Sequence, residues 1–553
     1  MSSQVKPADL ILVNGVIATV DPYFRFVEAM AVKGERICYL GYNGGAEVFL
    51  GPETRRIDLK GHLVLPGTVD AHIHAAYAGL SLSLEFVKVE PQDAKNLKEF
   101  NERIREKAER LPKDAWVIGW GFKTWQIEEW VKEKRLPNWK DIEEGACGHP
   151  VILNDGGLHC ILVSRRALEL AHITAETSFS KAEGYMYRFE DGSPTGLFTD
   201  FGTQAAVGRA ATHLTGDKMD ACLMAMQQEL NRFGITCHND IVGIGGDDIC
   251  FGTFGREALR GYERLRRQGK LTARVFVNML TGKGGVQSYD SIMDGLEEME
   301  AENIVGEAGG DWLRADGVKI FGDDDWGRDT DPERNGYCMF PGNTEDEQAK
   351  ELERTIRALH EKGRQIAIHI TGGKGIDVTV KALKEAEQAL PGRDLRHFLL
   401  HASGSSKENI EDCVRNNISC GAQASGGYEF GGETNYKALL DGGMLIAEGS
   451  DGPAIPMNWL LGLQFLVGRK AKDGKIYHPE QAIDLREAIR MYTIYGAWQN
   501  HAEDLIGSLE LGKCADLQVL DKNLFEIPPE EIGSARVLMT MCGGKTVYQS
   551  EDF

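Results

Sequence analysis

The sequence is poor in positive charge and has no long hydrophobic run, and each shortage excludes a class of function. Its 62 Lys and Arg residues are outnumbered by 84 Asp and Glu residues, which gives a formal net charge of −22. Nucleic-acid binding requires clustered basic residues, so no nucleic-acid partner is expected. No apolar run approaches the roughly 20 residues of a membrane span, so no membrane partner is expected either.

Paired cysteine motifs are also missing. The 11 cysteines are scattered along 553 residues, and no two of them form a C-x-x-C pair. This spacing is typical of reduced thiols in a cytosolic protein and not of a disulfide framework. The first residues, MSSQVKPADLILVNG, lack the long apolar stretch and the cleavage site of a signal peptide. These patterns predict a soluble, cytoplasmic protein.

Short strand-like runs lie at both ends of the chain, and a long α/β pattern lies between them. DLILVNGVIATVD near the N-terminus resembles ADLQVLD and KTVYQ near the C-terminus, so we expect residues 1–64 and 506–553 to form one small β-sandwich. The middle alternates buried-strand candidates with amphipathic helices, which indicates a parallel sheet. The fold class predicted is therefore α/β: a (β/α)8 TIM-type barrel over residues 65–505, with an inserted region at about residues 85–230.

Polar residues end several of the predicted barrel strands, where a barrel places its active site. Side chains two apart on a strand share a face, so both histidines of DAHIH point to one spot. That pair alone fits a packed strand end as well as a metal site. A lysine in a strand of Val and Ile is costly unless it is neutralised or paired. Five strand ends carrying such groups favour a metal site, and its candidate ligands are His72, His74, Lys319, His369, His401 and Asp451.

The order of these motifs carries a family resemblance. LPGTVDAHIH, GITCHND, GVKIFGD, AIHITGGKG and GSDGP follow one another with spacing that resembles the amidohydrolase superfamily. Within it, the chain resembles the amidohydrolase-3 branch of YtcJ-like hydrolases, which includes N-substituted formamide deformylases. The similarity extends over nearly the whole chain. One departure is Gly373, which stands where the family usually has Asp, so the resemblance leaves the substrate open.

The resemblance implies a centre of two divalent metal ions. The two histidines of DAHIH would hold the more buried ion together with Asp451, and His369 and His401 would hold the second ion. Lys319 would be carbamylated on its ε-nitrogen and would bridge both ions. Zn²⁺ is the first expectation for imidazole and carboxylate ligands, with Mn²⁺ or Fe²⁺ as alternatives.

The resemblance also implies a mechanism and a set of substrate residues. A hydroxide bridging the metals would attack a carbonyl, and Asp451 would carry a proton from the water to the leaving amine. His159, which matches a family G-H motif, would stabilise the oxyanion or bind the substrate carbonyl. Asp323 would orient a loop or a polar group of the substrate, and His238 would be a pocket or supporting residue. Trp120 would either line the pocket or pack in the core of the inserted region.

The leading hypothesis is hydrolysis of the C–N bond of a small-molecule amide, such as an N-formyl or N-acyl amine or a cyclic amide. A lactonase or esterase would use the same chemistry, so the sequence barely separates it. A deaminase on the same fold typically has a Glu shortly after the fifth-strand histidine, and HITGGKG has none. A catalytically inactive amidohydrolase-like scaffold protein is the alternative outside catalysis. A homo-oligomer, dimer or tetramer, is the expected assembly.

Overall fold

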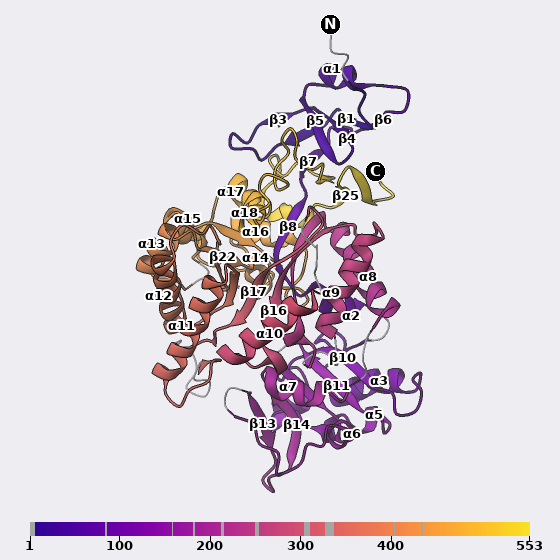
Figure 1. Cartoon of the computed structure of the whole chain (residues 1–553). Coiled ribbons are helices and arrows are strands. Elements are labelled where there is room, and N and C mark those ends of the chain that lie inside the picture. Colours follow the sequence, from indigo (N-terminus) through magenta and orange to yellow (C-terminus); the bar gives the residue numbers. More distant parts are fainter. Residues whose placement is uncertain are drawn as a thin grey trace.

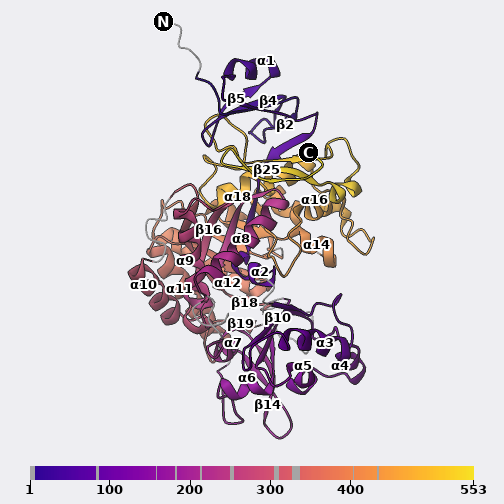
Figure 2. The same ribbon diagram turned by 90° about the vertical axis from the view of Figure 1, so that its right-hand side faces the viewer.

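The chain folds into three layers that follow one another along the long axis of the molecule (Figures 1 and 2). A β domain lies at the end that holds the N-terminus, a barrel lies in the middle, and a further α/β layer lies at the opposite end. The computed structural model describes residues 6–82, 86–156, 159–180, 183–211, 215–248, 254–303, 310–326, 337–402, 404–432 and 435–553.

The barrel is an eight-stranded sheet whose strands are neighbours in the order in which the chain makes them. All seven strand pairs are parallel. The backbone N–H of Asp451, just after the last strand, donates to the carbonyl of His72 in the first strand at 2.8 Å, which brings the two edges together. The strands are β8 (Thr68–Ile73), β15 (Ile235–Val242), β16 (Arg274–Leu280), β17 (Leu313–Phe321), β20 (Gln365–His369), β21 (Phe398–Leu400), β22 (Ser419–Ala422) and β23 (Ile446–Glu448).

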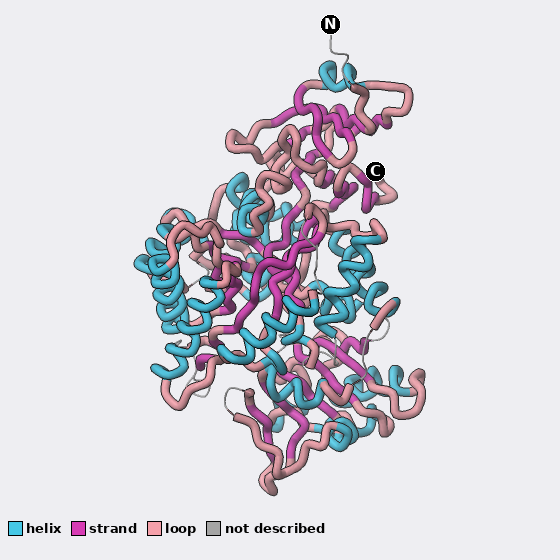
Figure 3. Tube along the Cα trace, in the orientation of Figure 1, coloured by secondary structure: helices cyan, strands magenta, loops and turns pink. Residues whose placement is uncertain are grey.

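Amphipathic helices surround these strands (Figure 3). In α11 (Glu345–Glu361), Leu352, Ile356 and Leu359 are spaced for one face and are fully buried, while Thr344 caps the first turn. In the described residues, no helix is long and apolar enough to cross a membrane. The other main barrel helices are α2 (Ala75–Leu82), α8 (Asp217–Arg232), α9 (Phe254–Arg267), α10 (Tyr289–Glu302), α12 (Gly373–Ala389), α13 (Lys407–Arg415), α16 (Trp459–Gly468), α17 (Leu485–Met491) and α18 (Ile494–Gln499).

The β domain is built from both ends of the chain. One sheet has the order β5-β4-β1-β6 and the other the order β26-β25-β24-β7-β2-β3, and Leu12, Val32, Leu517 and Met539 share the core between them. The barrel and the β-sandwich predicted from the sequence are both confirmed. The sandwich strands are β1 (Leu10–Val13), β2 (Val16–Ala18), β3 (Phe26–Val27), β4 (Ala29–Lys33), β5 (Arg36–Gly41), β6 (Arg55–Asp58), β7 (Leu63–Pro66), β24 (Leu517–Leu520), β25 (Val537–Cys542) and β26 (Lys545–Gln549).

The third layer, which we call the cap, comes from the chain between β8 and β15. It contains a six-stranded sheet of order β13-β14-β12-β11-β10-β9 with short helices around it. The cap covers the barrel end opposite the sandwich (Figure 2). Its elements are β9 (Phe86–Lys88), β10 (Val117–Phe122), β11 (Val151–Asp155), β12 (Cys160–Val163), β13 (Tyr185–Arg188), β14 (Pro194–Thr199), α3 (Leu97–Ala108), α4 (Glu128–Glu133), α5 (Glu143–Ala146), α6 (Arg165–Leu170) and α7 (Phe201–Gly208).

Candidate metal centre

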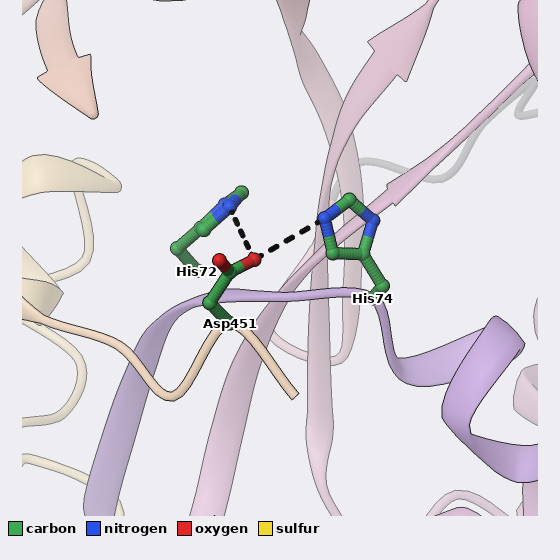
Figure 4. A group of neighbouring side chains, drawn as sticks. All are labelled: His72, His74 and Asp451. Carbon is green, nitrogen blue, oxygen red and sulfur yellow. Dashed lines mark ion pairs between the residues drawn. The ribbon is translucent and has the colours of Figure 1, made fainter. Parts of the chain in front are cut away.

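The end of β8 brings two imidazoles onto one carboxylate oxygen. His72 and His74 lie on the same side of the strand because Ile73, between them, points into the core. Their Nε2 atoms lie 3.1 and 3.3 Å from Oδ1 of Asp451, as Figure 4 shows. Three potential ligand atoms from two distant parts of the chain are therefore within the span of a single metal ion.

Backbone hydrogen bonds hold this group in place. The buried carboxylate of Asp70 accepts the N–H of Ser450 at 2.9 Å and the N–H of His72 at 3.3 Å, which joins β8 to the loop after β23. The buried carboxylate of Asp240 on β15 accepts the first two N–H groups of α2, which begins directly after His74. The backbone itself supplies no hydrogen-bond acceptor for these N–H groups at a strand end or at a helix start. The two carboxylates supply them and so anchor both segments that carry the ligands.

Two further histidines complete a ring of imidazoles. His369 ends β20 and His401 follows β21, and their ring centroids are 4.7 Å apart. The ring of His401 is also 5.5 Å from that of His72. Nδ1 of His401 lies 2.6 Å from Oε1 of Gln423, an oxygen that can only accept a hydrogen bond. The proton of His401 is therefore on Nδ1, and Nε2 keeps a lone pair for a metal ion.

Lys319 lies in the same centre as a buried amine. Its side chain is 1% exposed, and Nζ has no hydrogen-bond partner among the described residues. Nζ lies 4.7 Å from the centre of the Phe321 ring. Burial lowers the pKa of Lys319 to about 7, so a substantial fraction of the amine is neutral near pH 7. A neutral amine is the form that carbamylation requires.

The protonation states of the other groups suit metal binding. Burial lowers the pKa of His72 to about 3 and keeps the pKa of His369 well below its usual range, so both rings stay neutral. Burial alone would raise the pKa of Asp451, but hydrogen bonds from His72 and His74 outweigh it and hold the pKa well below its ordinary value. Neutral imidazoles, an ionised carboxylate and an amine open to carbamylation form a donor set that fits borderline divalent cations such as Zn²⁺.

All six ligand candidates line one open cavity, together with His159 from the cap. The ring of His159 is 6.0 Å from that of His369, and its Nδ1 atom has no hydrogen-bond partner in the described part of the chain. The structure therefore brings the cap histidine that matches the G-H motif to the ligand cluster contributed by the barrel.

The other predicted site residues lie outside the cavity lining. Asp323 is fully buried and accepts backbone N–H groups from Trp326, Thr371 and Gly372, so it orders the loop that follows β20. Burial raises its pKa to about 7. Trp120 is buried, with its ring 5.2 Å from that of Tyr77, which does line the cavity.

His238, expected as a pocket or supporting residue, lies within a strand and not in the cavity lining. Strand β15 continues four residues further, to Val242, so His238 lies in its middle. Its ring is fully buried, 6.1 Å from the ring of Tyr262 on α9. Burial lowers the pKa of His238 to about 3, so the ring is neutral. The side chain belongs to the layer between strand and helix.

Two residues that contact the ligands, Gln423 and Asp70, were not selected from the sequence, although a sequence pattern points to each. Gln423 directly follows β22, so the rule used for the histidines, a polar residue at a strand end, also selects it. Asp70 lies two residues before His72 and therefore shares its face of β8. Gln423 was missed because an amide is not a usual ligand of these metals, and Asp70 was missed because it lies inside β8 and not at its end.

A second cluster of possible metal ligands is held together by its own hydrogen bonds. His360, Glu387 and His397 lie close together between α11, α12 and β21. The backbone N–H of Ile366 donates to Nδ1 of His397, which leaves the His397 proton on Nε2, facing Nδ1 of His360 at 3.0 Å. Both facing nitrogens are used in that hydrogen bond, so this cluster is a structural network.

Comparisons with known proteins agree with this geometry. A model described as the amidohydrolase family matches residues 55–548. The putative amidohydrolase YtcJ of Bacillus subtilis is 26% identical over 95% of each chain. N-substituted formamide deformylase of Arthrobacter pascens is 24% identical over 98% of each chain. The crystal structure of an uncharacterized metal-dependent hydrolase from Pyrococcus horikoshii OT3 superposes with a TM-score of 0.70 at 22% identity, covering 94% of this chain and 99% of that one.

Proposed function

The chain belongs to the amidohydrolase family and is a metal-dependent hydrolase of C–N bonds, and on this premise we propose that it cleaves a small amide at a centre of two divalent cations. The observation that carries the proposal is the convergence of four imidazoles, one carboxylate and one unpaired amine on a single cavity. The names of two relatives, a putative amidohydrolase and a formamide deformylase, support an amide as the substrate.

The ligands divide between the two ions according to their contacts. His72 and His74 would hold one ion with Asp451, the oxygen that both rings already face. His369 and His401 would hold the other, and carbamylated Lys319 would bridge the pair. When bound, the cations would supply Lewis acidity, which lowers the pKa of water from about 15.7 towards neutrality and polarises a carbonyl.

The chain's own residues supply the proton transfers. Asp451 is ionised at neutral pH, so its carboxylate can accept a proton from the attacking water and return it to the nitrogen of the leaving amine. His159, with Nδ1 unpartnered beside the ligands, can donate to the carbonyl oxygen of the substrate as negative charge develops there. The balanced reaction is amide plus water to carboxylic acid plus amine.

Metal stoichiometry tests this proposal directly. The purified protein, reconstituted with Zn²⁺ and bicarbonate, is expected to bind about two equivalents per chain, as measured by plasma mass spectrometry. His369→Ala is expected to reduce binding to about one equivalent and to abolish amide hydrolysis, because only the second ion loses a ligand. The matched control is His478→Ala, at a half-exposed position that is not part of the cavity lining.

Three results would contradict the proposal or one of its parts. Less than about half an equivalent of metal after reconstitution would remove the bimetal centre. Hydrolysis of an ester or lactone without any hydrolysis of the corresponding amide would keep the centre and assign it to the lactonase or esterase alternative. Unchanged metal content in His369→Ala would show that this histidine is not a ligand.

A further inference from the structure

Away from the ligands, the walls of the cavity are apolar. Apart from the six ligand candidates, the described residues that line it contribute only two polar side chains, His159 and Tyr77. None of these other lining residues is charged. The main walls are formed by Phe201, Ile241, Val242, Phe254, Leu280 and Phe321.

The aromatic walls begin directly beside the metal ligands. The ring of Phe321 is 5.5 Å from that of His369, and the ring of Phe201, at the start of cap helix α7, is 4.5 Å from that of Phe321. On another side, the ring of Tyr77 lies 6.4 Å from that of Phe254, at the start of α9. A group attached to an amide at the centre would therefore meet aromatic surface contributed by both the cap and the barrel.

A charged group on the substrate would have no partner among the described residues of these walls. Moving a carboxylate or an ammonium from water to an apolar surface without a counter-charge is strongly unfavourable. The cationic groups of the centre would be engaged by the amide itself. The net charge of −22 also disfavours the approach of an anion. The described lining of the cavity thus disfavours a charged substituent on the substrate.

We infer that the substrate is an uncharged N-substituted amide whose substituent is aromatic or branched aliphatic, selected by a wall that includes Phe201. This inference rests on the proposed amide hydrolysis and specifies its substrate class. It excludes N-acyl amino acids, which carry a free carboxylate, and small polar amides, which would leave the aromatic surface uncovered.

The experiment uses a matched pair of compounds with the zinc-loaded enzyme. N-(2-phenylethyl)formamide and N-formylphenylalanine differ only in the carboxylate of the latter, and N-methylformamide lacks the aromatic group. We expect kcat/KM for the neutral aromatic compound to exceed that of N-formylphenylalanine by about 100-fold or more, because the carboxylate is buried unpaired. N-methylformamide is expected to be poorer by about 10- to 100-fold, because it loses apolar contact.

Substitutions of Phe201 test whether this aromatic wall selects the substrate. Phe201→Ala is expected to lower kcat/KM for the neutral aromatic compound by about 10-fold or more and to leave N-methylformamide nearly unchanged, which a general loss of folding would not do. Phe201→Leu, which keeps an apolar side chain, is expected to retain most of the preference. Trp125→Ala is the matched control, since Trp125 is an aromatic residue of the cap that is 65% exposed.

Calorimetric binding of the same compounds separates this inference from the proposed reaction. Tight binding of the neutral aromatic compound without turnover would support the substrate class and contradict the proposed hydrolysis. Binding or turnover of N-formylphenylalanine equal to that of the neutral compound would overturn the substrate class and leave the hydrolysis intact. Failure of the neutral aromatic compound to bind at all would also overturn it.

Discussion

Replacing Lys319 with methionine is expected to stabilise the metal-free protein while abolishing hydrolysis by the metal-loaded protein. The side chain is buried and Nζ has no hydrogen-bond partner in the described residues, so the ammonium form is poorly accommodated. Methionine has a similar length and flexibility and fills the same space without a polar group. The substitution therefore removes an unfavourable interaction from the metal-free fold.

The size of the effect follows from the pKa. Burial lowers the pKa of Lys319 from 10.5 to about 7, and each tenfold change in acidity constant corresponds to about 1.4 kcal/mol. Below pH 7 both folded and unfolded chains carry the proton, and the buried ammonium costs on the order of 5 kcal/mol. Between pH 7 and 10.5 the unfolded chain binds a proton that the folded chain does not, so the cost falls as pH rises. At pH 9 about 2 kcal/mol remains.

Urea unfolding of the metal-free proteins at pH 6 and pH 9 measures this difference. The midpoint of Lys319→Met is expected to lie above that of the wild type at both pH values, with the larger gap at pH 6. Lys98→Met is the control, because the Lys98 side chain is 84% exposed, and its midpoint should follow the wild type. With metal and bicarbonate restored, Lys319→Met should lose activity by at least about 100-fold. Loss of a residue that only supports a ligand already lowers metal affinity or activity by about 10- to 100-fold.

Either of two outcomes would refute this reasoning. A lower midpoint for Lys319→Met than for the wild type at pH 6 would show that the amine stabilises the metal-free fold through a partner. A gap of equal size at pH 6 and pH 9 would show that the proton on Nζ is not the source of the cost.

Three other substitutions test the supports of the metal centre and of the barrel. Gln423→Leu removes the acceptor for Nδ1–H of His401. Metal affinity, measured in competition with a chelator, is expected to fall by about 10- to 100-fold. Gln423→Glu keeps an acceptor and should bind the metal normally. Arg274→Met leaves the carboxylate of Asp516 buried without its cation. The free energy of unfolding, measured in urea, is expected to fall by about 3–5 kcal/mol. Adding Asp516→Leu should restore part of the lost stability. Asp240→Ala removes the acceptor at the start of α2 and is expected to cost about 1–2 kcal/mol in the same assay, and an unchanged midpoint would contradict this role.

The barrel and the ligand candidates could be predicted because both depend on local regularities. Alternation along a strand places His72 and His74 on one face, and parallel strands bring their carboxyl ends to one mouth. Burial of Lys319 among Val and Ile could be inferred from the apolar run around it. Strand lengths were harder, because GITCHND gives no local signal that β15 continues to Val242, and this places His238 in the middle of the strand.

The substrate side of the cavity could not be predicted because it depends on contacts between distant segments. Phe201 enters the lining only because the cap sheet folds over the barrel and brings α7 against β17. Nothing near Phe201 in the sequence distinguishes it from a residue that packs inside the cap. Trp125 is the opposite case, since an aromatic residue in the same region is largely exposed.

The apolar surroundings of the centre link ligand protonation to substrate choice. Burial lowers the pKa of Lys319, His72 and His369, which keeps them in the neutral forms that metal binding and carbamylation require. The same low polarity leaves a charged substrate without compensation. An arginine on the wall could pair with a substrate carboxylate, and its positive charge would lower the pKa of nearby lysine and histidine side chains further, which keeps them neutral. Neutral ligands therefore depend on burial, whereas the absence of charge from the walls among the described residues bears on the substrate.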